Sequence, residues 1–133
     1  MSISVYKKTI TSTPNPAEIE RRILASAACE LEQHAEAFDQ AESANDRMQV
    51  LSGGLRDALW ENQRIWMTFA KLLKSPSSEL PEALRADLIS LSIFVTNTTS
   101  AVLGGKGSVA PLVALNRSMI EGLTGQKQQA TGS

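Results

Sequence analysis

The apolar residues between Asp46 and Lys74 constrain the fold more than any other feature of the chain. They recur in alternating steps of three and four residues, the spacing that keeps side chains on one face of an α-helix. Such a heptad-like seam packs helices side by side at shallow angles. The sequence therefore predicts a long helix in a bundle, whose core face is formed by Met48, Leu51, Leu55, Leu59, Asn62, Trp66, Phe69 and Leu73.

Two glycines, Gly53 and Gly54, interrupt the first third of this helix. Each glycine inside a helix costs about 1 kcal/mol relative to alanine. The pair is therefore consistent with a kink, with a close contact to another helix, or with a helix that starts later than Asp46.

An earlier helix is predicted from Asn15 onward. Asn15 is a suitable N-cap, Pro16 fits the first helical position, and Glu18 completes a capping box. Asn45 and Asp46 are the expected break before the next helix. His34 is expected at the edge of the apolar arc and Cys29 roughly opposite it, while the arc itself is formed by Ile19, Ile23, Ala27, Leu31, Ala35 and Phe38.

A third helix is predicted to begin at Pro81, after the stop at residues 75–78. It is apolar on nearly all sides, which is typical of the central helix of a bundle. One stripe is expected at Leu84, Leu88, Leu91, Val95 and Val102, a second at Ile89, Ile93 and Leu103, and Phe94 on a third side. A β-strand over 88–95 is the competing interpretation, because that run is short and rich in β-branched residues.

A last helix is predicted over 109–123, after a glycine-rich connector at 104–108 that we expect to be flexible. Residues 124–133 lack the apolar side chains that would offset the entropy of ordering, so a disordered tail is expected. Residues 1–14 form an arm, either loose or docked on the bundle or a partner. The fold class is thus all-α: a small bundle of about four helices over residues 15–123, with flexible N- and C-terminal tails.

Composition excludes several classes of function. The 133 residues include 13 Lys and Arg against 14 Asp and Glu, and this balance argues against general nucleic-acid binding. The single cysteine excludes an internal disulfide. The N-terminus lacks the pattern of a signal peptide, and the longest apolar run, around 88–95, is too short to span a bilayer. We therefore expect a cytoplasmic protein without membrane insertion.

The residues that could perform chemistry are few. His34 and Cys29 are five residues apart and point away from each other, so they do not form a nucleophile–base pair. Glu30, Glu32 and Glu36 near His34 lack the mirrored ligand set of a metal-binding bundle. The connector 104–108 lacks the spacing of a phosphate-binding loop. We expect a protein that is not an enzyme and that uses no cofactor or metal.

Trp60 and Met67 are the first candidates for partner binding. They are one heptad apart on the second helix but lie off its core seam. They either contact a second neighbouring helix or face a partner, and Trp and Met are both favoured in protein interfaces.

Several ordered segments resemble the FlaF family of flagellar proteins. The resemblance extends from about Tyr6 to Leu123, and the Gly53–Gly54 pair and the 104–108 connector have no counterpart in it. The matching pieces are Ala58 and Leu59 with Asn62 and Trp66, then 80–91, Pro111 and Leu112, 115–117, and 120–123.

The resemblance implies a cytoplasmic regulator of flagellar biosynthesis. FlaF-like proteins promote flagellin synthesis and type III secretion by binding flagellin, and they act opposite FlbT. Arg85, Asn116 and Arg117 lie in the resembling segments and join Trp60 and Met67 as partner-binding candidates, although the two arginines could instead pair with Asp87 and Glu121. The alternative function is a structural helical adaptor that forms homo-oligomers.

Overall fold

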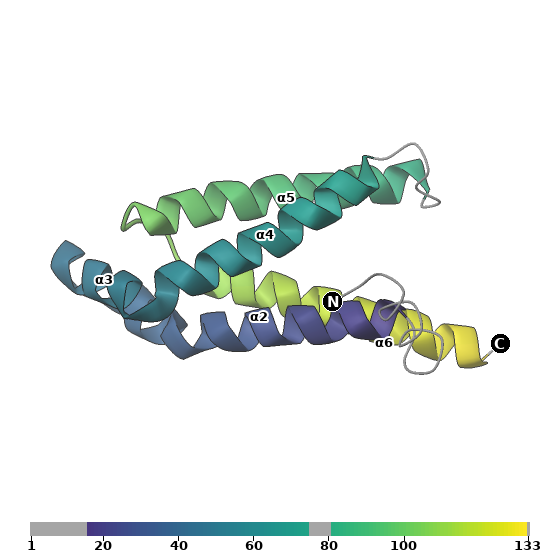
Figure 1. Cartoon of the computed structure of the whole chain (residues 1–133), viewed down its shortest axis with the longest axis horizontal. Helices are drawn as coiled ribbons and strands as arrows, with labels where there is room; N and C mark the ends of the chain where they lie inside the picture. Colours follow the sequence, from purple (N-terminus) through teal and green to yellow (C-terminus); the bar gives the residue numbers. More distant parts are fainter. Residues whose placement is uncertain (1–15, 75–80, 133) are drawn as a thin grey trace, which may run out of the picture.

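The computed structural model describes residues 16–74 and 81–132, and these residues form helices joined by short turns (Figure 1). Four long helices are α2 (Pro16–Asp39), α4 (Arg56–Leu73), α5 (Glu82–Leu103) and α6 (Ala110–Gly132). A short helix, α3 (Ala44–Val50), and a π-helical turn, η1 (Leu51–Leu55), lead into α4. The described residues contain no strand, so the all-α prediction is confirmed and the strand alternative for 88–95 is wrong.

Several predicted boundaries differ from the observed ones. The break between the first two helices comes before Ala44, where the Ser43 side chain accepts a hydrogen bond of 3.1 Å from the Asp46 backbone N–H. Helix α6 continues to Gly132, beyond the end predicted at Leu123 and through most of the segment expected to be disordered. The predicted N-terminal arm and the Asn15 cap lie outside the described residues.

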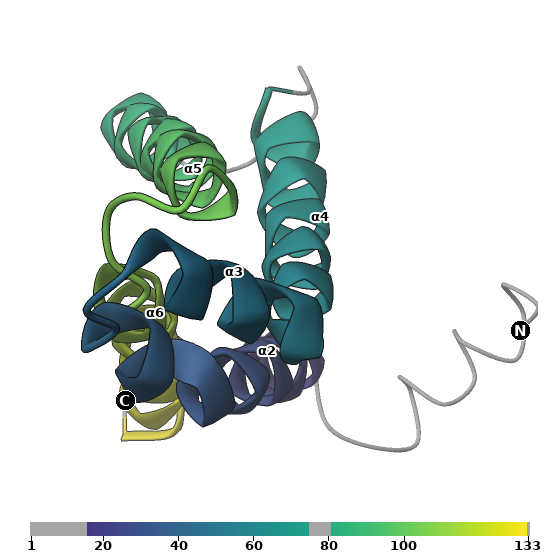
Figure 2. The same cartoon turned by 90° about the vertical axis from the view of Figure 1, so that its left-hand side faces the viewer.

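The long helices form two pairs. Helix α2 lies beside α6 and α4 lies beside α5, and the first part of α4 also packs on α2 (Figure 1). The view along the bundle shows the α4–α5 pair stacked above the α2–α6 pair (Figure 2). This arrangement makes α2 and α4 the helices that link the two pairs.

The core lies where the two pairs meet. Leu51, Leu55, Leu59, Asn62 and Trp66 of the predicted seam are fully or almost fully buried, which confirms the seam over most of its length. Met48 is an exception and is exposed, because α3 precedes the kink and points this residue away from the core. Other large buried side chains are Leu24, Leu31, Phe38, Val95, Val102, Val109 and Leu112.

The buried face of α2 is wider than predicted and is displaced at its N-terminal end. Ala27, Leu31 and Phe38 are buried as expected, whereas Ile23 is exposed and Leu24 is fully buried in its place. Helix α2 contacts both α6 and α4, so the side chains covered by its neighbours extend beyond a single periodic stripe.

Helix α5 is peripheral, not central as its composition predicted. It packs mainly on α4 and buries Ser92, Val95, Thr99 and Val102 along that contact. Ile93 and Phe94 are 56% and 42% exposed, because no described helix covers the other sides of α5. Apolar composition allowed a central position, but the pairing with α4 determines what is buried.

Helix α5 also has the length and composition of a membrane-spanning helix. An 18-residue window within Glu82–Leu103 has a mean hydropathy of 1.3, and 22% of that window is buried inside the molecule. No such segment was predicted, because the longest apolar run, around 88–95, is too short to span a bilayer. After that run, Thr96, Thr98, Thr99 and Ser100 are uncharged and lead into the apolar residues 101–103, which lengthens the weakly apolar region.

The Gly53–Gly54 pair produces both a kink and a close contact. Gly54 has φ of 128°, a conformation that side-chain-bearing residues rarely adopt. A Cβ atom at Gly54 would lie 3.0 Å from the His34 ring. The glycine therefore permits the π-helical turn and lets it pack against α2.

Candidate functional site

Trp60 and Met67 lie on the outer face of α4. Each follows a buried core residue, Leu59 or Trp66, and one step along a helix turns the side chain by about 100°. Trp60 is 49% and Met67 58% exposed. The alternative in which they pack on a second helix is therefore wrong for this structure, and both are available at the surface.

Asn116 lies at the centre of a buried polar network between α4 and α6. Its side-chain oxygen accepts a hydrogen bond of 2.9 Å from the Trp66 indole N–H, and its amide N–H donates to Asn62 Oδ1 at 2.7 Å. Asn116 and Asn62 are completely buried. Asn116 is thus a core residue that joins two helices, and the predicted role in partner binding does not fit its position.

Two buried side-chain polar atoms of the described residues lack a hydrogen-bond partner. Asn62 Nδ2 and, on α5, Thr99 Oγ1 are buried and have no hydrogen-bond partner among the described residues. A buried polar group in this state costs about 1–3 kcal/mol. These unpaired atoms therefore offset part of the stability that burial of the neighbouring apolar side chains gives to the core.

Arg117 connects α6 to α2. Its Nε and Nη2 atoms each lie 2.9 Å from Glu32 Oε1, and Nη2 donates to Cys29 Sγ at 3.6 Å. The hydrogen bonds to Cys29 and to Glu32 raise the pKa of Arg117, so the guanidinium stays positively charged. The acidic neighbour of Arg117 is Glu32 on another helix, whereas the sequence offered Glu121 as the intramolecular alternative.

Arg85 is in the first turn of α5, half-buried, and its backbone N–H donates to the Pro81 carbonyl. The described residues contain no ion pair between Arg85 and Asp87. The five candidates therefore do not form one site: Trp60 and Met67 share a face, Arg117 joins two helices, Asn116 is in the core, and Arg85 opens α5.

Asp39 was missed by the sequence analysis. It ends α2, yet its carboxylate accepts hydrogen bonds from the Val109 N–H at 2.7 Å, the Ala110 N–H at 3.0 Å and the Ser108 hydroxyl at 2.8 Å. It thereby caps the start of α6, and its negative charge interacts favourably with the positive N-terminal end of the helix dipole. The predicted flexible connector is thus attached to α2. Because Asp39 is about 70 residues away from the helix that it caps, no local sequence pattern predicts this contact.

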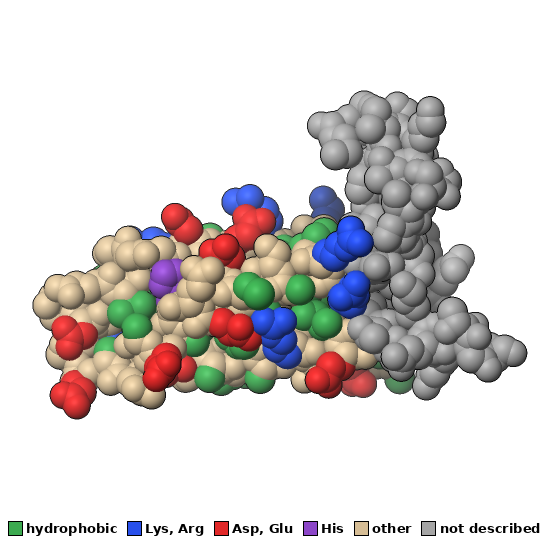
Figure 3. Space-filling model, turned by 90° about the horizontal axis from the view of Figure 1, so that it is seen from below, with side chains coloured by type: hydrophobic (Ala, Val, Ile, Leu, Met, Phe, Trp, Pro, Cys, Tyr) green, Lys and Arg blue, Asp and Glu red, His purple; other side chains and the backbone are tan. Residues whose placement is uncertain are grey.

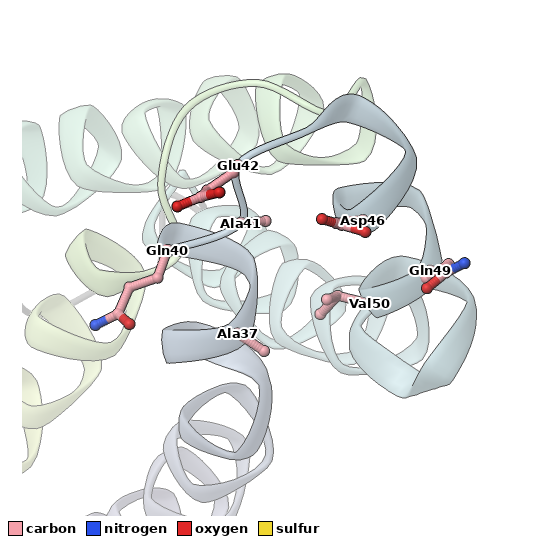
Figure 4. A pocket seen from close by; sticks show the side chains of 7 residues that line it. All are labelled: Ala37, Gln40, Ala41, Glu42, Asp46, Gln49 and Val50. Carbon is pink, nitrogen blue, oxygen red and sulfur yellow. The ribbon is translucent and has the colours of Figure 1, made fainter.

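The described residues contain an open hollow but no cluster of metal ligands. They include no cluster of three or more His, Cys, Asp or Glu side chains that could hold a metal ion. An open hollow at the α2–α3 corner contains two carboxylates, Glu42 and Asp46, among amide, alanine and valine side chains (Figure 4). Its labelled side chains include no nucleophile paired with a base.

The lower face of the molecule, formed by α2 and α6, carries acidic, basic and hydrophobic side chains interspersed (Figure 3). Neither charge dominates that view, which matches the near-neutral composition.

Comparisons with known proteins complete the description of the chain. No curated protein and no solved structure gives a significant match. A protein family described as "Flagellar protein FlaF" matches residues 2–123. That match covers most of the 133 residues, including all of α2 to α5 and the first part of α6. The chain therefore belongs to the FlaF family of flagellar proteins.

Proposed function

We propose that this protein regulates flagellar biosynthesis by binding flagellin in the cytoplasm and promoting its synthesis and type III secretion. The observation that supports this function most directly is the exposed Trp60–Met67 pair on a chain of the FlaF family. Large apolar side chains left in water on one helix face are typical of a surface that a partner covers.

In this proposal the protein acts by burying apolar surface of its partner and not by catalysing a reaction. Removing apolar surface from water contributes roughly 25 cal/mol per Å² before the costs of association are subtracted. A chaperone of this kind covers a flagellin segment until export. A functional link with FlbT, acting in the opposite direction, belongs to the same proposal.

The direct test mixes purified protein with monomeric flagellin. Light scattering coupled to size-exclusion chromatography measures the mass of the complex, and we expect one of each chain. A protein that remains separate from flagellin at micromolar concentrations of both would contradict the proposal.

Trp60→Ala tests the proposed surface. We expect flagellin binding to weaken by about tenfold, because an aromatic residue central to an interface contributes on the order of 1–2 kcal/mol. The melting temperature should remain nearly unchanged, since Trp60 is half-exposed. Ile93→Ala, which removes an exposed apolar side chain from α5, is the control and should bind normally. A large loss of stability in Trp60→Ala would place this residue in the core.

The alternative function is a structural adaptor that forms homo-oligomers. The observation that favours it is the exposed apolar side of α5, with Ile93 and Phe94. The same chromatography separates the two functions. An oligomer of the protein alone, which is disrupted by Ile93→Asp and does not bind flagellin, would support the adaptor.

A further inference from the structure

The outer face of α4 is basic as well as apolar. Trp60 and Arg64 are one turn apart, and Met67 and Lys71 repeat this spacing further along the helix. We call the resulting surface the basic face of α4; it consists of the exposed residues Arg56, Trp60, Arg64, Met67, Lys71 and, at the C-cap, Lys74.

These cations are largely free to meet an external charge. Arg64 forms an ion pair of 3.3 Å with Glu61, but both side chains are well exposed and such pairs are weak. Within residues 16–74 and 81–132, no ion pair involves Arg56, Lys71 or Lys74. The whole chain has one more acidic than basic residue, so this concentration of cations does not simply reflect composition.

No described helix covers the basic face. Helix α4 lies at the edge of the bundle, with α5 on one side and α2 below it (Figure 2). The buried side of α4 already packs in the core through Ala58, Leu59 and Trp66. A partner can therefore lie along the outer face without displacing any helix of the bundle.

We propose that the basic face of α4 binds an amphipathic helix with acidic side chains, and that this helix is the flagellin segment the protein recognises, which makes the inference rest on the proposed function. Trp60 and Met67 are seven residues apart, which is about 10.5 Å along a helix. A partner helix lying along α4 places two of its own turns against them. Its flanking carboxylates then face Arg56, Arg64 and Lys71.

The narrow exposed apolar surface of α4 favours a polypeptide over a lipid surface. A helix that lies on a membrane has a wide apolar face directed into the lipid. The wide apolar face of α4 is buried in the bundle. Its large exposed apolar side chains are Trp60, Met67 and Leu72, and Leu72 is turned by about 140° from Met67, away from the basic face.

The chain has two tryptophans, which provide a residue-specific readout. In ¹H–¹⁵N spectra of the full chain, the Trp60 indole N–H is assigned from its absence in Trp60→Phe. The Trp66 indole N–H, hydrogen-bonded to Asn116 in the core, is an internal reference. Monomeric flagellin and a synthetic Leu/Glu amphipathic peptide are added in turn, and both should shift the Trp60 signal. A Leu/Lys peptide of the same length should not.

Charge reversal gives the matched comparison. Lys71→Glu should weaken binding of flagellin and of the Leu/Glu peptide by about tenfold or more at low salt, and by less at 0.5 M salt because screening reduces the attraction. Lys106→Glu makes the same change of net charge in the exposed turn between α5 and α6. It should leave both affinities within about twofold of the wild type.

The outcomes separate this inference from the proposed function. Flagellin binding that neither shifts the Trp60 signal nor responds to Lys71→Glu would overturn the inference and leave the proposed function standing. Binding of the Leu/Glu peptide without flagellin binding would support the surface and overturn the proposed function. A Trp60 shift caused by phosphatidylglycerol vesicles, with none from the peptide or flagellin, would overturn the inference in favour of a membrane contact.

Discussion

At the scale of single residues, polar groups in the core do more to specify this structure than the helical pattern reveals. Trp66, Asn116 and Asn62 form a chain of two buried hydrogen bonds between α4 and α6. An indole N–H buried without a partner is unfavourable, so the position of α6 relative to Trp66 is fixed by Asn116. The network thus sets the register of two helices that have few other close backbone contacts.

Asn116→Ala should destabilise the protein by about 2–4 kcal/mol, because it leaves the Trp66 N–H and Asn62 Oδ1 unpaired and opens a cavity. The measurement is urea unfolding followed by circular dichroism. Asn97→Ala, an exposed residue on α5, is the control and should change stability by less than about 0.5 kcal/mol. Equal effects in the two variants would show that the network contributes little.

Glu20 on α2 predicts a pH dependence. Its partial burial raises the pKa of its carboxyl group above the ordinary value of 4.5. The folded state then binds the proton more tightly than the unfolded chain, so stability is greatest below the ordinary pKa and declines as the pH rises through the raised value.

Glu20→Gln removes this dependence because glutamine remains neutral. We expect the variant to be more stable than the wild type at pH 7, by less than about 1 kcal/mol since the side chain is partly in solvent. The advantage should vanish at pH 3.5. Urea unfolding at the two pH values measures it, with the exposed Glu30→Gln as control. If Glu20→Gln were still more stable than the wild type at pH 3.5, the difference would not come from ionisation of Glu20.

At the scale of elements, the junction between α3 and α4 is the most constrained position. The chain changes direction through η1, and only Gly54 in this turn has a positive φ. The His34 ring lies 3.0 Å from where a Cβ atom of residue 54 would be, which is too close for an ordinary contact. A backbone requirement and a steric requirement therefore coincide at one glycine, while its neighbour Gly53 has open space around it.

Gly54→Ala should destabilise the protein by about 1–3 kcal/mol, because alanine must either adopt a strained backbone or push His34 aside. Gly53→Ala is the matched control and should be neutral or stabilising by up to about 1 kcal/mol, since alanine favours helix. Thermal unfolding of both variants gives the comparison. Identical melting temperatures would mean that the kink tolerates a side chain.

At the scale of the whole molecule, the two helix pairs are not equally embedded. Helix α2 packs against both α6 and α4, whereas α5 relies on α4 for most of its contacts. The Asp39 carboxylate ties α2 to the start of α6 and thus completes the lower pair. Helix α5 has an apolar composition but leaves Ile93 and Phe94 in water.

This asymmetry predicts that α5 opens before the rest of the bundle. Backbone amides in the middle of α5 should exchange with solvent at a free energy below that of global unfolding, whereas those around Leu31 in α2 should require global unfolding. Native-state hydrogen exchange by NMR, with increasing urea, measures both. A single opening energy for the two helices would show that α5 is as firmly held as the core.

The sequence by itself determined where most of the helices lie. Periodic apolar spacing, Pro16 and Pro81 near helix starts, and the polar segment at 75–78 are local signals, and helix formation responds to local signals. The same periodicity identified the buried positions Leu55, Leu59 and Trp66 and placed Trp60 and Met67 off that seam, but it did not decide whether a second helix covers them.

Only the tertiary structure decided which apolar surfaces are covered and which polar groups meet. A periodic stripe shows that a helix can bury a face, but it does not say which helix lies against it. The predicted burial of Ile23 and the predicted central position of α5 were therefore wrong, although Val95 and Val102 of the predicted α5 stripe are buried. The pairings of Arg117 with Glu32 and of Asp39 with the start of α6 span 85 and about 70 residues of sequence. Contacts at such separation depend on how helices stack, because no local spacing encodes them.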